Sequence, residues 1–205
     1  MEKDHTDLVR FLVKEAHADV NCKDRADKTP LLIACGSDDT DLVKWLVNEG
    51  NARVNCKCSS AWFDYTPLHA AVKANNVESV RFLVSKGAYV EAKDSSGQTP
   101  LYLAVDSRWT APEIVECLVK DGHATVNCRE SLNGFTPLHA WAMVYEGKAI
   151  IGEILIIAGA DLDARDKKGF TPMQRAMAYE RSDAVKVLAA YKDRDRNNNG
   201  ACSVM

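Results

Sequence analysis

The sequence predicts an all-α repeat solenoid, in which stacked helix-turn-helix units are joined by β-hairpin fingers. Three features support this fold class. The dipeptide Thr-Pro recurs at intervals of 33 to 37 residues, a short apolar segment follows each copy, and a second, amphipathic segment follows the first. The five copies begin at Thr29, Thr66, Thr99, Thr136 and Thr171.

Each Thr-Pro pair is predicted to begin the first helix of its unit. A Thr hydroxyl can accept a hydrogen bond from a free amide at a helix N-terminus, and Pro at the first helical position has no N–H to leave unbonded. The segments that start with these pairs read TPLLIAC, TPLHAAV, TPLYLAV, TPLHAWA and TPMQRAM.

The second helix of each unit is predicted from apolar residues at three- and four-residue spacing. This pattern follows Asp41, Glu78, Glu113 and Asp183, in LVKWLV, SVRFLV, IVECLV and AVKVLA. Glycine then suits a left-handed helix C-cap, at Gly87, Gly122 and Gly159. An extended segment such as RVNC or TVNC leads from there to the next Thr-Pro.

These segments resemble the ankyrin repeat, whose signature is T-P-L-H-x-A, and the resemblance covers roughly residues 7–191. It implies an array over residues 1–191 and a flexible tail over residues 192–205. The approximate repeats are 1–23, which is partial, then 24–60, 61–93, 94–130, 131–165 and 166–191.

Two departures from the repeat pattern are predicted to alter the array locally. The segment before Thr29 supplies only a second-helix pattern, LVRFLV after Asp7, so the N-terminal cap is expected to be incomplete. Extra residues near Trp109 and near Tyr145 predict longer loops between the two helices of those repeats.

Composition excludes several classes of protein. Apolar residues make up 46% and charged residues 27% of the 205 residues, which is ordinary for a folded protein. A formal charge of −3 argues against nucleic acid as a partner, and no apolar run is long enough for a membrane span. The absence of a signal peptide and the odd count of seven cysteines favour reduced thiols and a cytoplasmic monomer.

Aromatic residues at hairpin tips and inter-helix loops are the candidate partner-binding site. Stacked repeats leave their concave face open, and exposed aromatic side chains there are typical of binding hot spots. The tip before Thr66 is the richest, with AWFDY. The candidate residues are Trp62, Phe63, Tyr65, Trp109, Phe135, Tyr145, Phe170 and Tyr179.

Some of these rings have an alternative role in packing. Phe135 and Phe170 each precede a Thr-Pro, where a ring can equally pack on the neighbouring hairpin. Trp45 lies in the middle of a second helix and is interpreted as a core residue.

A basic residue recurs where each hairpin begins, usually followed by an acid. The basic residues are Lys23, Lys57, Lys93, Arg129 and Arg165. Such a row of charge could hold an acidic peptide, but alternating signs at a fixed position favour solvated ion pairs of small energetic value.

Catalytic and metal chemistry find no support in the sequence. Resemblance to the family implies that His69 and His139 fix the hairpins through hydrogen bonds, and Cys22, Cys56 and Cys128 are interpreted as small core side chains. Cys56 and Cys58 lack a second ligand pair for zinc, and no phosphate-binding loop or nucleophile motif is present. We therefore expect no enzyme activity, no cofactor and no metal.

The function that the resemblance implies is a non-catalytic protein-protein interaction module: a scaffold, adaptor or inhibitor. The alternative is a substrate-recognition subunit of a ubiquitin ligase, which requires the chain to be a fragment because few residues follow Tyr191. The last four residues, CSVM, match a C-a-a-X box, so we also expect farnesylation of Cys202 and transient association with cytosolic membrane faces.

Overall fold

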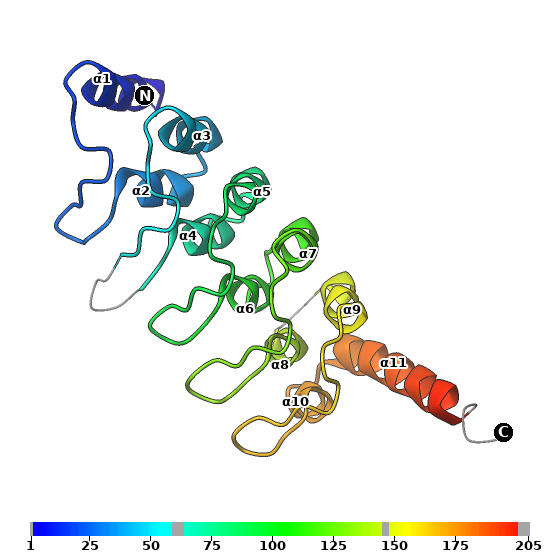
Figure 1. The fold of residues 1–205 in the computed structure, drawn as a ribbon. Coiled ribbons are helices and arrows are strands. Elements are labelled where there is room, and N and C mark those ends of the chain that lie inside the picture. The colour runs from blue at the N-terminus through cyan, green and yellow to red at the C-terminus, as the bar shows by residue number, and fades with distance from the viewer. Residues whose placement is uncertain (1, 59–63, 145–147, 201–205) are drawn as a thin grey trace.

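The computed structural model describes residues 2–58, 64–144 and 148–200, which form eleven helices in two columns (Figure 1). The helices are α1 (Glu2–Lys14), α2 (Pro30–Gly36), α3 (Thr40–Asn48), α4 (Pro67–Lys73), α5 (Val77–Ser85), α6 (Pro100–Val105), α7 (Pro112–Lys120), α8 (Pro137–Met143), α9 (Ala149–Ile157), α10 (Pro172–Ala178) and α11 (Ser182–Gly200). None of the helices in these ranges is long and apolar enough to cross a membrane.

The predicted first helices are confirmed, because α2, α4, α6, α8 and α10 each begin at the Pro of a Thr-Pro pair. In every case the Thr backbone is extended and its hydroxyl accepts the amide two residues after the Pro, as Thr29 does from Leu32. The helix start therefore follows from the side chain of one capping residue.

The core is a ladder of leucines between the two columns of helices. Each first helix packs on the second helix of its own repeat and on the next first helix (Figure 1). One leucine on each side of this contact is fully buried in most repeats. The ladder contains Leu31, Leu68, Leu101 and Leu138 from the first helices and Leu46, Leu83, Leu118, Leu155 and Leu188 from the second. Trp45 is buried in α3, as predicted.

The fingers are tight turns without paired strands in the described part of the chain, so only the hairpin shape of the predicted fingers is found. In the third finger the Asp94 amide donates to the Gln98 carbonyl at 3.0 Å. The Asp94 carboxylate accepts the amides of Ser96 and Gln98 at 2.9 and 2.8 Å. The Asp94 side chain therefore takes hydrogen bonds from backbone amides that would otherwise be available for pairing between strands.

The left-handed C-caps differ from the prediction at one position. Gly87 and Gly159 have positive φ, as expected, but after α7 it is His123 and not Gly122 that is left-handed, with φ of 54°. A Cβ at Gly122 would lie 2.8 Å from the Leu118 carbonyl oxygen. Gly122 therefore allows close packing, and the sharp turn comes one residue later.

The array departs from regularity in two further places. Six residues connect α6 to α7, where three connect α4 to α5, which confirms the longer loop at Trp109. The longer loop at Tyr145 includes residues outside the described ranges. Helix α11 continues to Gly200 and projects beyond the stack (Figure 1), so residues 192–200 are helical where we expected a flexible tail.

Candidate functional site

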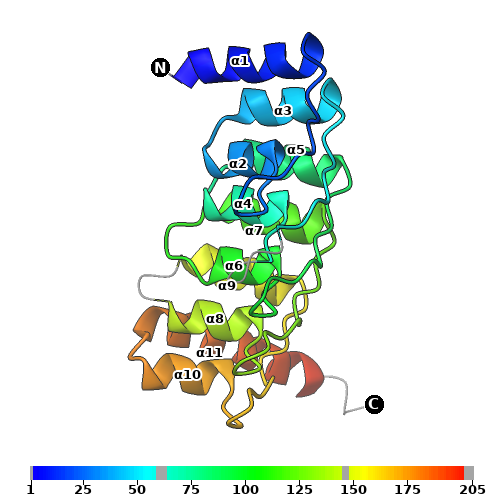
Figure 2. The same cartoon turned by 90° about the vertical axis from the view of Figure 1, so that its left-hand side faces the viewer.

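The open face of the stack is formed by the first helices and the fingers (Figure 2). A first helix buries the leucine that follows its Thr-Pro pair and turns its C-terminal residues outward, as Lys73 and Met177 show. Side chains at these positions and in the adjoining loops are the ones that a partner can reach.

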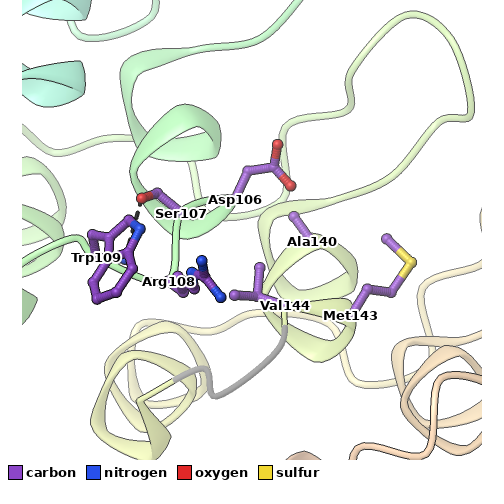
Figure 3. Close-up of a pocket in the computed structure, with 7 residues that line it drawn as sticks. All are labelled: Asp106, Ser107, Arg108, Trp109, Ala140, Met143 and Val144. Atoms are coloured by element: carbon purple, nitrogen blue, oxygen red, sulfur yellow. Dashed lines mark hydrogen bonds between the residues drawn. The ribbon is translucent and has the colours of Figure 1, made fainter.

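A shallow hollow of about 470 Å³ lies on this face between the C-terminal ends of α6 and α8 (Figure 3). The end of α6 and its loop form one side, and α8 forms the other. The lining residues are Asp106, Ser107, Arg108, Trp109, Ala140, Met143 and Val144.

Trp109 is the most prominent side chain at the hollow, with 70% of its surface exposed. The guanidinium of Arg108 lies 4.6 Å from the centre of a Trp109 ring, a cation–π distance. The Trp109 amide donates to the Ser107 hydroxyl at 3.3 Å (Figure 3). An exposed indole is therefore held at the edge of the hollow.

The loop that carries Trp109 is fixed by the repeats on both sides. Asn75 donates from its amide nitrogen to the Trp109 carbonyl at 3.2 Å and accepts the Ala111 amide at 2.8 Å. From the other side the Lys148 ammonium donates to the Thr110 carbonyl at 3.2 Å. Three bonds from outside the loop hold its backbone, so the position of the Trp109 backbone at the edge of the hollow is set by both neighbouring repeats.

Two charged groups of opposite sign line the hollow. Desolvation raises the pKa of Asp106 above its ordinary value, and the neighbouring charge of Glu130 adds to this effect. Arg108 supplies the group of opposite charge, a planar guanidinium with several donors. The hollow therefore combines apolar walls with one acid and one base, an arrangement for recognition of another protein's side chains.

A second cluster on the open face joins the last two fingers to α10. The Arg175 guanidinium lies 5.2 Å from the centre of the Phe135 ring and 4.6 Å from that of Phe170. It also bonds the fully buried Asp166 carboxylate through Nε at 2.7 Å and Nη2 at 2.6 Å. Burial alone would raise the pKa of Asp166, but these bonds and the amides of Phe170 and Lys168 hold it below its usual value.

Comparison with known proteins identifies the repeats. A family model described as ankyrin repeats, in three copies, matches residues 1–94, 38–129 and 108–200. This chain belongs to the ankyrin-repeat family. Ankyrin repeats indicate a module for protein-protein interaction.

Similarity to individual ankyrin-repeat proteins covers part of their length. The chain is 34% identical over 142 residues to ankyrin repeat protein FPV031 of fowlpox virus, which covers 65% of this chain and 40% of the viral protein. It is 34% identical over 137 residues to mouse Rabankyrin-5, covering 60% of this chain and 11% of that protein. Human SH3 and multiple ankyrin repeat domains protein 2 is 34% identical over 123 residues, covering 60% and 6%.

The predicted aromatic residues fall into three groups in the ankyrin array. Tyr65 and Phe135 are half-buried and stack on His69 and His139, with ring centres 5.5 and 5.8 Å apart. These two rings pack within their own repeats, so Phe135 has a packing role, but its stacking partner is its own helix start and not the neighbouring hairpin that was expected as the alternative. The exposed group is Trp109, Phe170 and Tyr179. Trp62, Phe63 and Tyr145 lie outside the described residues, as does Cys202.

Sequence reasoning missed Met143, Val144 and Arg175. The repeat alignment contained a signal for Met143, which lies seven residues after Thr136, because Asp106 lies at the equivalent position, seven residues after Thr99. Val144 follows Met143 directly. Equivalent positions of neighbouring first helices must face the same side of the stack. The position of Arg175 between two rings has no comparable signal, since it depends on the spacing of two fingers.

The basic row on the fingers makes exposed ion pairs at its start and structural ties at its end. Lys23 pairs with Asp27 at 2.9 Å and Lys57 with Asp64 at 2.8 Å, in agreement with the prediction of solvated ion pairs, although the acid is not the one that follows directly. Arg129 donates to the carbonyls of Gly134 at 2.8 Å and Arg165 at 2.6 Å, and so links its finger to the next one. The acid Glu130 is buried and accepts the amides of Leu132 and Asn133. At Arg129 and Glu130, acid and base therefore satisfy backbone groups instead of each other.

The predicted role of the histidines agrees with their contacts. His69 contacts the Thr66 hydroxyl through Nδ1 at 2.9 Å and the Gln98 carbonyl through Nε2 at 3.2 Å, and His139 makes the same pair of contacts with Thr136 and Phe170. Each imidazole thereby ties its own helix start to the next finger.

The interpretation of the cysteines as core residues is wrong for Cys22. Cys56 and Cys128 are half-buried, with Sγ 3.1 and 3.4 Å from the hydroxyls of Thr29 and Thr99 in the Thr-Pro pair that precedes each of them, whereas Cys22 is exposed. No Thr-Pro helix precedes Cys22 in the described chain, so nothing covers it. No group of three His, Cys, Asp or Glu side chains in the described ranges could hold a metal ion.

Proposed function

We propose that this ankyrin array is a non-catalytic interaction module whose partner protein binds across the open face, with the hollow at Trp109 as its anchor point. The observation that carries this proposal is the exposed indole, held by bonds from both neighbouring repeats beside apolar Met143 and Val144. Little side-chain or loop entropy is lost when a partner contacts a group that is already fixed.

The chemistry of the hollow indicates what the partner places there. Met143, Val144 and Ala140 form an apolar floor that fits an apolar or aromatic side chain. Asp106 and Arg108 can then pair with polar groups beside that side chain. Tryptophan and arginine are the residue types that most often dominate interface energies.

The remaining predicted aromatics extend the proposed surface along the fingers. Phe170 is exposed and rests on Arg175, which offers a second, ordered aromatic contact toward α10. Trp62, Phe63 and Tyr65 belong to the proposal as the contribution of the second finger. Together these positions fit a partner that spans several repeats.

The experiment compares Trp109→Ala with Tyr89→Ala, an aromatic residue that is 66% exposed after α5. Partners captured by the wild-type chain from a cell lysate are identified by mass spectrometry, and the affinity of each variant for the purified partner is then measured by calorimetry. We expect Trp109→Ala to lose about 2 kcal/mol of binding free energy, roughly 30-fold in Kd.

Thermal melting of both variants separates binding from stability. We expect both melting temperatures to stay close to that of the wild type, because an exposed side chain stabilises the fold little. Equal affinity of Trp109→Ala, Tyr89→Ala and the wild type would show that the hollow is not the anchor point.

A further inference from the structure

Helix α9 is apolar on a side where the other second helices are polar. The second position of the helix is acidic in all the others, at Asp41, Glu78, Glu113 and Asp183, but is Ile150 in α9. The ninth position is Asn48, Ser85, Lys120 or Ala190 elsewhere, but is Ile157 in α9. The difference therefore concerns one helix of an otherwise regular column.

The two substituted positions form a continuous stripe on the outer surface together with Ile154, whose equivalents Trp45, Phe82, Cys117 and Val187 are also apolar. Ile150, Ile154 and Ile157 are spaced four and three residues apart, which places them on one face of the helix. Ile150 is 47% and Ile157 is 75% exposed, and Ile154 is half-buried between them. Ile151 and Leu155, on the opposite side, are buried in the core.

A helix that is apolar on all sides is normally covered on all sides. At nine residues α9 is too short to span a membrane, and Ile150 and Ile157 of its outer stripe are exposed to solvent. An exposed apolar stripe on a folded chain typically marks a contact with another molecule.

The charges beside the stripe indicate the partner's chemistry. The fifth position of the second helices is Lys44 in α3 and Arg81 in α5, but Glu116 in α7 and Glu153 in α9. Glu113 is also exposed on α7, which packs beside α9. Lys120, the basic residue nearest to these acids on α7, is paired with Glu116. Glu113 and Glu153 therefore form an acidic border on the α7 side of the stripe, whereas α11, on its other side, carries the exposed Lys186 at the fifth position.

We propose that the α9 stripe binds an amphipathic helix of a partner protein, with its apolar face on the three isoleucines and Lys or Arg along the edge toward α7. Apolar residues spaced at i, i+4 and i+7 on α9 form a surface on which the apolar face of an amphipathic helix can dock. Charge complementarity at the border fixes its orientation. The stripe lies on a second helix, whereas the hollow lies between two first helices, and the proposal stands independently of the proposed function.

Two other occupants fit the same charges poorly. A second copy of the chain would bring identical acidic borders together, and three isoleucines bury much less area than a stable dimer interface needs. An anionic lipid surface would be repelled by Glu113, Glu116 and Glu153. Both are tested as separate outcomes below.

The test uses two synthetic 18-residue helical peptides that share one leucine face and carry either Lys or Glu on the other positions. Binding of each fluorescent peptide to the full chain is measured by fluorescence anisotropy. The matched variant is Ile150→Thr with Ile157→Ser, where Ser is the residue that α5 carries at the second of these positions. Trp109→Ala serves as a control for binding at the hollow.

We expect the Lys peptide to bind the wild type at least tenfold more tightly than it binds the isoleucine variant. The wild type should also bind the Lys peptide at least tenfold more tightly than the Glu peptide. Trp109→Ala should bind like the wild type, and Glu113→Gln with Glu153→Gln should weaken the Lys peptide several-fold at low salt. Equal affinity of wild type and isoleucine variant, or of the two peptides, overturns the proposal.

Two further measurements distinguish the alternative occupants. Sedimentation velocity that shows a dimer only for the wild type would assign the stripe to a second copy. Stronger co-sedimentation of the wild type than of the isoleucine variant with phosphatidylserine vesicles would assign it to lipid. We expect a monomer and no vesicle binding in both measurements.

Discussion

His69 and His139 show how single residues connect successive repeats. A carbonyl oxygen can only accept, so the contact with Gln98 requires a proton on Nε2 of His69. Nδ1 then accepts from Thr66, whose amide is 3.3 Å away. Burial lowers the pKa of both imidazoles below the ordinary value of 6.5. Protonation at Nδ1 would also place an N–H donor against the amide N–H and the hydroxyl of the capping Thr, which disfavours the charged imidazole.

The lowered pKa values predict a dependence of stability on pH. Below pH 6.5 the unfolded chain binds protons that the folded histidines do not, so the free energy of unfolding falls as pH drops and levels off below the folded pKa values. Chemical denaturation between pH 8 and pH 5 measures this slope. We expect it to be reduced in the double variant His69→Gln, His139→Gln.

Glutamine is the matched substitution because the last repeat already uses it. Gln174 occupies the equivalent position and accepts the Thr171 amide through Oε1 at 2.9 Å. The cap is therefore kept, while each bond to the next finger is lost, at about 1 kcal/mol per site at pH 7.5. An unchanged slope in the double variant would assign the pH dependence to other groups.

At the scale of elements, the contact between α8 and α9 uses different side chains from the equivalent helix pairs of the other repeats. The fifth residue after Thr is Ala in four first helices, and the fourth residue of their second helices is Val. In α8 and α9 these positions are Trp141 and Gly152. A Cβ at Gly152 would lie 2.3 Å from the Trp141 ring, so the indole occupies the space that a valine fills in the other repeats.

This exchange of volume predicts strong coupling between the two residues. Trp141→Ala alone should cost about 3 to 5 kcal/mol through the cavity it leaves, and Gly152→Val alone about 1 to 3 kcal/mol through overpacking. The double variant restores the usual Ala and Val pair, and we expect it to cost at least about 2 kcal/mol less than the sum of the single changes. Urea denaturation of the four proteins measures the coupling.

A distant pair provides the control for the double-mutant cycle. Trp141→Ala combined with Val43→Ala, in α3, should be additive because the two sites share no contact. If the stability changes were additive in both cycles, Trp141 and Gly152 would not be coupled, and the indole would not be the reason for glycine at position 152.

Helix starts could be predicted from the sequence, whereas exposures could not. Thr29 and its equivalents act through bonds within three residues, so their effect is readable locally. The turn at His123, by contrast, depends on how far α7 extends, and the open thiol of Cys22 depends on what stacks against it. Among the candidate aromatics, Phe135 and Phe170 both precede a Thr-Pro pair, but Phe135 is half-buried and Phe170 is exposed, because the burial of each ring depends on what the fold places beside it.

At the scale of the whole molecule, stability is shared between neighbours along a line. Helix α1 is held at one end of the stack by Val9 and Val13, which are only partly buried against the core, and by cation–π contacts of Arg10 and Lys14 with Trp45. Its polar ties are at least partly exposed: Thr6 donates to Asp39 at 2.9 Å, and Lys14 pairs with Glu49 at 2.7 Å. Leu8, Phe11 and Leu12 remain exposed on α1. Helices α6 and α8, by contrast, are covered by repeats on both sides.

This arrangement predicts that α1 opens before the rest of the array. Amides of α1 should exchange with solvent fastest in native-state hydrogen exchange, and those of α6 and α8 slowest, at rates near those of global unfolding. Thr6→Ala should speed exchange in α1 and leave α6 and α8 unchanged, because the loss is confined to one end of a chain of nearest-neighbour contacts. Mass spectrometry of the exchanged peptides resolves these segments. Protection of α1 equal to that of α6, or an effect of Thr6→Ala that reaches α8, would show that the array unfolds as one cooperative unit and that the ties between α1 and α3 are stronger than their exposure indicates.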